Sequence, residues 1–134
     1  MKFLKYLFFS LLIFFTSCDP PHDLIFINQG NSVAKVKIQI DTTLEYNEFS
    51  KFDELKSDTL VYNLKPSDTC VLFFGIGTWS EKEIKKIANL INKLEIENAD
   101  FKETYKTKAR IEQTLLEKRE DKTGWKTKII FEIK

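Results

Sequence analysis

Residues 33–40 read Val-Ala-Lys-Val-Lys-Ile-Gln-Ile, and this stretch decides the class of fold. Apolar and polar side chains alternate along it from Ala34 to Ile40, which predicts a β-strand with one buried and one solvated face. A short apolar run, residues 24–27, lies just before it. The intervening residues 28–32, Asn-Gln-Gly-Asn-Ser, are typical of a turn. We therefore expect the two runs to form a β-hairpin.

Two more strands are predicted further along the chain. Residues 59–64 have the composition of a strand, and Pro66 follows at the favoured second position of a turn over 65–68. Residues 69–76, Thr-Cys-Val-Leu-Phe-Phe-Gly-Ile, are almost continuously apolar, as expected of a strand covered on both faces. The turn between these strands resembles turns in immunoglobulin-like sandwiches.

One amphipathic helix is predicted at about residues 80–95. Ser80 and Glu83 have the spacing of a capping box, in which each side chain hydrogen-bonds the backbone of the other. The apolar residues that follow share one face of a helix: Ile84, Ile87, Ala88, Ile91 and Leu94. This face most simply docks on a sheet.

The last third of the chain allows two interpretations. Residues 105–118 have good helix propensity, but apolar and polar side chains also alternate there. The sequence 121–124, Asp-Lys-Thr-Gly, is typical of a hairpin turn, and residues 125–133 alternate again. We therefore expect a long terminal hairpin in preference to a helix followed by a strand.

These elements predict a mainly β, α+β domain. Five to six mostly antiparallel strands would form a sandwich or a curved sheet with one helix packed on a face. Residues 41–58 remain as a loop with a possible short helix, which makes them a candidate functional loop. The chain of 134 residues has room for one such domain, over 23–134.

The amino-terminal segment has the pattern of a secretory signal. Lys2 and Lys5 form a short positive region, residues 6–15 are nearly all apolar, and Thr16-Ser17-Cys18 follow. The apolar core is about half of the roughly 20 residues that a helix needs to cross a bilayer. A cleaved signal over 1–17 is therefore favoured over a permanent transmembrane anchor.

Residues 15–18, Phe-Thr-Ser-Cys, resemble the lipobox of bacterial prolipoproteins. The resemblance implies that the Cys18 thiol receives a diacylglycerol, that cleavage occurs just before Cys18, and that its new amino group is acylated. The composition is also similar to that of small envelope lipoproteins of Bacteroidota type. Residues 18–22 would then be a short, stiff tether, since Pro20 and Pro21 favour an extended path. The expected location is the cell envelope, with the membrane as partner.

The charge balance excludes broad classes of partner. The formal net charge is +1, and basic and acidic residues are interleaved along the chain. A nearly neutral, mixed surface has no extended field for nucleic acid or anionic lipid. We therefore expect no nucleic-acid partner and no second, electrostatic membrane anchor.

The residues that usually carry catalysis are scarce. His22 is the single histidine, and in a Pro-Pro tether we expect it to be solvated. Without another histidine, Ser-His and Cys-His nucleophiles have no base, and histidine-rich metal sites are excluded. Cys70 is expected to be a small buried core residue. We expect no metal, no cofactor and no phosphate-binding loop, because Gly75-Ile76-Gly77 lacks the further glycine and basic residue of such loops.

The carboxylates are expected at the solvated surface beside lysines: Asp41, Glu45, Glu48, Asp53, Glu54, Glu95, Glu97 and Asp100.

Three classes of function remain open. The first is a non-enzymatic envelope lipoprotein that binds a protein or serves as a structural accessory. The second is a module that binds carbohydrate or another small ligand through exposed aromatic residues, with four candidate contacts: Trp79, Trp125, Tyr46 and Tyr62. The third is an enzyme that works through two facing carboxylates.

Overall fold

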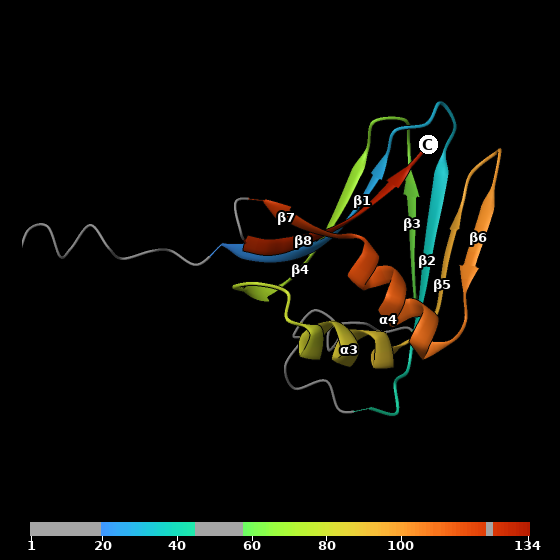
Figure 1. The fold of residues 1–134 in the computed structure, drawn as a ribbon. Helices are drawn as coiled ribbons and strands as arrows, with labels where there is room; N and C mark the ends of the chain where they lie inside the picture. The colour runs from blue at the N-terminus through green and yellow to red at the C-terminus, as the bar shows by residue number, and fades with distance from the viewer. Residues whose placement is uncertain (1–19, 45–57, 123–124) are drawn as a thin grey trace, which may run out of the picture.

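The computed structural model describes residues 20–44, 58–122 and 125–134, and these form eight strands and two helices. Figure 1 shows their arrangement. In chain order they are β1 (Pro21–Asn28), β2 (Ala34–Ile40), β3 (Thr59–Leu64), β4 (Thr69–Ile76), α3 (Glu81–Leu90), β5 (Ile91–Glu97), β6 (Lys102–Tyr105), α4 (Lys108–Glu117), β7 (Arg119–Lys122) and β8 (Trp125–Ile133).

The strands form two four-stranded sheets, with orders β4-β1-β8-β7 and β3-β2-β5-β6. We call them sheet A and sheet B. Every neighbouring pair is antiparallel except β1 and β8, which run parallel in the middle of sheet A. The prediction of a mainly β, sandwich-like α+β fold is confirmed. Eight strands form where five to six were predicted, because β5 was expected to be part of the helix and because β6 and β7 are only four residues long.

The core lies between the two sheets and extends under the helices. Sheet A contributes Leu24, Phe26, Ile129, Phe131 and Ile133, all buried. Sheet B contributes the apolar half of the alternating strand β2, namely Val36, Ile38 and Ile40. The alternation that predicted a half-buried strand is therefore confirmed for β2, and β8 follows the same rule from Thr127 onward.

The predicted hairpin of residues 24–27 with 33–40 is wrong. Both strands exist, but β1 pairs with β4 and β8 in sheet A, whereas β2 pairs with β3 and β5 in sheet B. The connection at residues 29–33 therefore passes from one sheet to the other. A two-sheet core can bury both apolar faces against each other, which an isolated hairpin cannot do.

The turn at residues 65–68 forms as predicted, with Asp68 N donating to Lys65 O at 3.0 Å. It also connects the two sheets, because β3 is an edge of sheet B and β4 is an edge of sheet A. The prediction that residues 69–76 are covered on both faces is wrong. Val71 is 49% exposed, since β4 has a strand on one side only and its outer face is solvated.

Helix α3 starts where the capping box predicts and ends earlier than residue 95. Ser80 Oγ accepts from Glu83 N at 3.2 Å, and the Glu83 carboxylate accepts from Ser80 N at 2.9 Å. After Leu90 the chain enters β5, and Ile91 pairs with Ile40 of β2. Ile91 and Leu94 are buried in β5 and not in the helix. The apolar face predicted for one helix therefore combined residues of α3 with residues of the following strand. The helix packs chiefly against α4 and not on a sheet.

The preference for a strand over residues 105–118 is wrong. Thr107 accepts from Arg110 N at 3.3 Å and starts α4, which buries Ile111 and Leu115. The Lys108 ammonium donates to the carbonyls of Asn89 and Ile91, at 2.6 and 3.0 Å, and so satisfies the end of α3. The terminal hairpin itself is present but short, and joins β7 to β8.

The folded domain begins at residue 21, two residues before the boundary predicted from the sequence. β1 begins at Pro21, so residues 21 and 22 belong to the domain and not to a tether over 18–22. His22 is buried within β1, contrary to the expectation that it is solvated. No helix in the described part of the chain is long and apolar enough to span a bilayer.

Candidate functional site: a cleft between the two sheets

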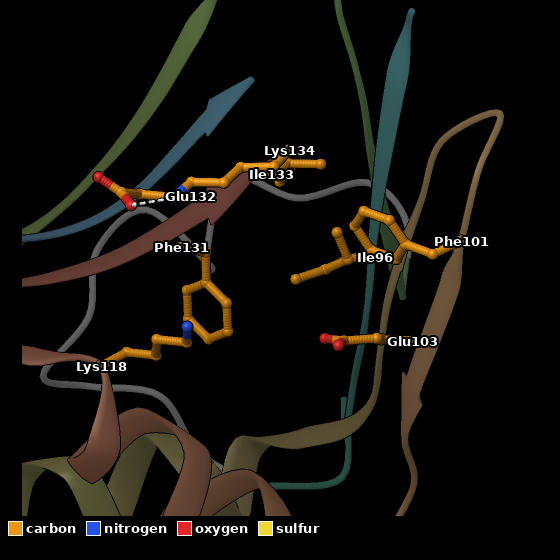
Figure 2. Close-up of a pocket in the computed structure, with 8 residues that line it drawn as sticks. All are labelled: Ile96, Phe101, Glu103, Lys118, Phe131, Glu132, Ile133 and Lys134. Atoms are coloured by element: carbon orange, nitrogen blue, oxygen red, sulfur yellow. Dashed lines mark ion pairs between the residues drawn. The ribbon is translucent and has the colours of Figure 1, made fainter. Parts of the chain in front are cut away.

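A cleft of about 310 Å³ opens between the carboxyl end of β8 and the β5–β6 edge of sheet B. Figure 2 shows the residues that line it, which are Ile96, Phe101, Glu103, Lys118, Phe131, Glu132, Ile133 and Lys134. They come from both sheets and from the end of α4. A short turn joins the two sheets on their β3–β4 side, whereas on the β6–β7 side α4 links them and the cleft lies beside it (Figure 1).

Asn98 holds the rim of the cleft in place. Its Oδ1 accepts from Asp100 N and Phe101 N, at 2.9 and 3.0 Å, which shapes the turn between β5 and β6. Its Nδ2 donates to Lys134 O at 2.9 Å. One side chain therefore ties the edge of sheet B to the end of β8 in sheet A, and presents Phe101 at the cleft.

The floor of the cleft is apolar and rigid. Phe131 is buried and stacks on Phe26, with ring centroids 5.0 Å apart. Ile96 projects from β5 toward the same space, and Phe101 covers it from the turn, partly exposed (Figure 2). Stacked rings between two sheets have little freedom to move, so the floor keeps its shape whether or not something occupies it.

Two opposite charges face the cleft beside this floor. The Glu103 carboxylate points in from β6 and the Lys118 side chain lies along Phe131 on the other side (Figure 2). Glu103 also accepts from the Tyr105 hydroxyl at 2.6 Å. Burial and that hydrogen bond raise the pKa of Tyr105 to about 12. The phenol therefore stays protonated and holds the carboxylate in place.

The second carboxylate of the cleft wall, Glu132, faces away from Glu103 (Figure 2). It forms an ion pair with Lys134 at 3.7 Å and accepts from Gln29 at 2.9 Å. Glu103 and Glu132 therefore do not form the pair of facing carboxylates that a hydrolase working through two acids requires. The cleft combines an apolar floor with one fixed acceptor and one cation, an arrangement suited to binding.

The predicted aromatic ligand contacts are not brought together. Trp79 is 1% exposed, and its indole donates to Asp23 O at 3.1 Å, so it is a core residue. Trp125 is 43% exposed at the start of β8. Tyr62 lies half-buried on β3, in the other sheet. Tyr46 and Cys18, the lipidation site predicted from the sequence, lie outside the described residues.

Cys70 lies partly buried on β4 and packs against the core. Burial raises the pKa of Tyr62, and the neighbouring Cys70 adds to the effect. Tyr62 on β3 and Cys70 on β4 therefore lie near each other, on the side where the turn at residues 65–68 joins the sheets. The expectation of a buried core residue is met only in part, because Cys70 packs against the core but is partly exposed.

Four of the eight carboxylates predicted at the surface lie within the described ranges, and none of the four is buried: Asp41, Glu95, Glu97 and Asp100. Glu95 and Glu97 project from β5 beside lysines, with Lys102 Nζ 2.7 Å from Glu97 Oε2. Asp41 Oδ1 accepts from the Thr43 hydroxyl at 2.6 Å. Glu45, Glu48, Asp53 and Glu54 lie outside the described residues. In the three described ranges, no cluster of three or more His, Cys, Asp or Glu side chains could hold a metal ion.

Searches against protein families, curated proteins and solved structures each found no match to this chain. The cleft is therefore described from its lining residues alone and not from a related protein. Sequence reasoning missed it because Phe101 and Phe131 lie thirty residues apart, in different sheets. The signal that pointed toward it was the Asn-Ala-Asp-Phe turn at residues 98–101, whose Asn can bond its own backbone.

Proposed function

We propose that this protein is a lipid-anchored lipoprotein of the bacterial envelope that works by binding a protein partner in the cleft. The anchor is Cys18, and the signal over residues 1–17 is removed. The position of β1 supports this arrangement most directly. Its first residue, Pro21, is only three positions after Cys18, so a lipid there would be attached almost directly to a central strand of sheet A.

The cleft supports the binding role. Its floor accepts an apolar side chain, while Glu103 and Lys118 can each pair with a polar group beside it. Buried aromatic pockets with a polar rim are where binding energy concentrates at protein interfaces. The open edge of β6 lies beside the cleft, so an extended partner segment could pair with this strand while its side chain enters the floor.

Metabolic labelling with a fatty-acid analogue tests the anchor. Cys18→Ser should abolish labelling and release the protein from the membrane fraction, because two or three acyl chains are needed for stable attachment. Cys70→Ser is the matched control, since it removes the other cysteine and should leave labelling unchanged. Retention of the Cys18→Ser protein in the membrane would favour an uncleaved signal anchor and overturn the proposal.

Site-specific photo-crosslinking in intact envelopes tests the cleft. A photoreactive phenylalanine analogue at position 101 should give a discrete cross-linked species, and Glu103→Arg should diminish it. The same probe at Val71, exposed on the opposite edge of the sandwich, is the control. Equal cross-linking from both positions, or none from position 101, would count against the cleft as the binding site.

A small ligand is the second candidate occupant, favoured by the cleft volume of about 310 Å³, which lies at the lower end of the range for such sites. It would bind on Phe101 and Phe131 and not on the four aromatic residues expected from the sequence. Thermal stabilisation of the isolated domain by a small-molecule extract of the envelope, lost in Phe101→Ala, would select this candidate over the protein partner.

A further inference from the structure

Two large apolar side chains are exposed at one end of sheet A. Ile76, the last residue of β4, is 68% exposed, and Trp125, the first residue of β8, is 43% exposed. Ile76 pairs with Pro21, and Gly77 N donates to Pro20 O at 2.8 Å. The parallel register matches Asp23 with Lys128, so Trp125 stands level with Pro20. Figure 1 shows the start of β1, the end of β4 and the start of β8 at this one end.

This end is also where the chain comes from Cys18. Three residues of extended chain reach at most about 11 Å, and the headgroup region on each side of a bilayer is roughly 5–8 Å deep. A lipidated Cys18 would therefore hold the start of β1 at the headgroups. Ile76 is the strand partner of Pro21, so it cannot lie far from the same layer.

We propose that this end of sheet A, around which Pro21, Ile76 and Trp125 lie, is a membrane-contacting surface that orients the domain on the bilayer. The inference rests on the proposed lipidation of Cys18. Tryptophan favours the membrane interface, where its ring is apolar and its N–H remains wet. Lys126, exposed beside Trp125, supplies an ammonium for lipid phosphates. Because the acyl chains already hold the protein at the surface, weak contacts suffice to select one orientation.

The orientation has a consequence for the cleft. β1 runs away from this end over eight residues, or seven steps of about 3.3 Å that together span about 23 Å. The carboxyl end of β8, parallel to β1, carries the cleft residues Phe131 and Ile133. The membrane surface and the cleft therefore lie at opposite ends of sheet A, and the cleft opens away from the bilayer, toward a partner in the aqueous space.

Tryptophan fluorescence of the full lipidated protein in phosphatidylethanolamine–phosphatidylglycerol vesicles tests the proposal. Trp125 should emit at shorter wavelength than in the non-lipidated Cys18→Ser protein, and brominated lipids should quench it. Trp125→Phe should lose both effects while the buried Trp79 still emits. Ile76→Ser should weaken the quenching. In the Trp125→Phe background, Val33→Trp places a probe at the opposite end of the domain, and it should stay accessible to aqueous iodide.

The possible outcomes distinguish a failure of the membrane-contacting surface from a failure of Cys18 lipidation. A wild-type protein that fails to float with vesicles indicates that the lipid anchor is absent. Flotation with Trp125 fully open to iodide and untouched by brominated lipid would overturn the membrane surface alone. Shielding of Trp125 that grows with protein concentration before vesicles are added would assign the surface to a second copy, and would also overturn it.

Discussion

The imidazole of His22 packs against the indole of Trp79, with ring centroids 4.5 Å apart and planes inclined by 46°. His22 is 4% exposed, and within the described part of the chain neither ring nitrogen has a hydrogen-bond partner. The indole N–H, by contrast, donates to Asp23 O. The pair thus closes the end of the core at the start of β1, with one satisfied and one unsatisfied polar ring.

The His22 ring should be replaceable by an apolar one. His22→Phe removes two buried polar atoms but enlarges the ring beside Gly75, and because these effects oppose each other we expect little change in stability. His22→Ala removes the ring and leaves a cavity beside Trp79, which should cost about 2–4 kcal/mol of unfolding free energy. Urea denaturation of the two variants measures both effects. Marked destabilisation by His22→Phe would mean that the imidazole nitrogens are satisfied after all.

Gly75 should tolerate no side chain because His22 fills the adjacent space. A Cβ at Gly75 would lie 3.1 Å from His22 Cε1, at a φ of +149°. Gly77 is the matched control, since its φ of +116° is also unfavourable but nothing lies within 4 Å of its Cβ. Gly75→Ala should therefore lower the melting temperature more than Gly77→Ala. Equal effects would show that backbone strain alone matters at Gly75.

Asn28 should be among the most sensitive polar residues of the fold. It is fully buried, and its amide donates to Leu64 O at 2.9 Å and to Ser32 O at 2.8 Å, which joins sheet A to sheet B. Asn28→Ala leaves these carbonyls without the amide, at about 1–3 kcal/mol for each buried group. Thermal unfolding should show a clear loss of stability, whereas the exposed Asn31→Ala should change little. Similar behaviour of the two variants would contradict this role.

The capping box of α3 should stabilise the fold only above acidic pH. Burial raises the pKa of Glu83, but the two hydrogen bonds from Ser80, together with nearby positive charge, outweigh it, so the pKa lies below the ordinary 4.5. A carboxylate with a lowered folded-state pKa stabilises the protein above its unfolded pKa, and this contribution is lost as the pH falls through the folded-state value.

Ser80→Ala should therefore cost about 1 kcal/mol near neutral pH. The difference from the wild type should shrink as the pH is lowered below 4.5. Chemical denaturation at a series of pH values measures it. The control is Thr107→Ala at the start of α4, which removes a cap without a carboxylate partner, so its cost should vary less with pH. A constant cost for Ser80→Ala would show that Glu83 is not part of the cap.

The sequence alone determined the features that depend on neighbouring residues. The alternation over 34–40 indicates which face of β2 is buried, because side chains of a strand alternate between two faces whatever strand lies beside it. Ser80 and Glu83 locate the start of α3, because both hydrogen bonds of the capping box span three residues. Pro66 marks the turn for the same local reason.

Strand pairing, the end of α3 and the position of the cleft follow instead from packing between segments that are distant in the sequence. β1 could pair with its neighbour β2 by sequence, yet it joins β8, with Phe26 matched to Phe131. Residues 108–117 become a helix because Ile111 and Leu115 find a buried face beside α3. These outcomes depend on which apolar faces meet in three dimensions, and local patterns that allow two structures do not decide that. The sequence predicted His22 in a solvated tether, but it is buried because its ring packs against Trp79, which is distant in the sequence.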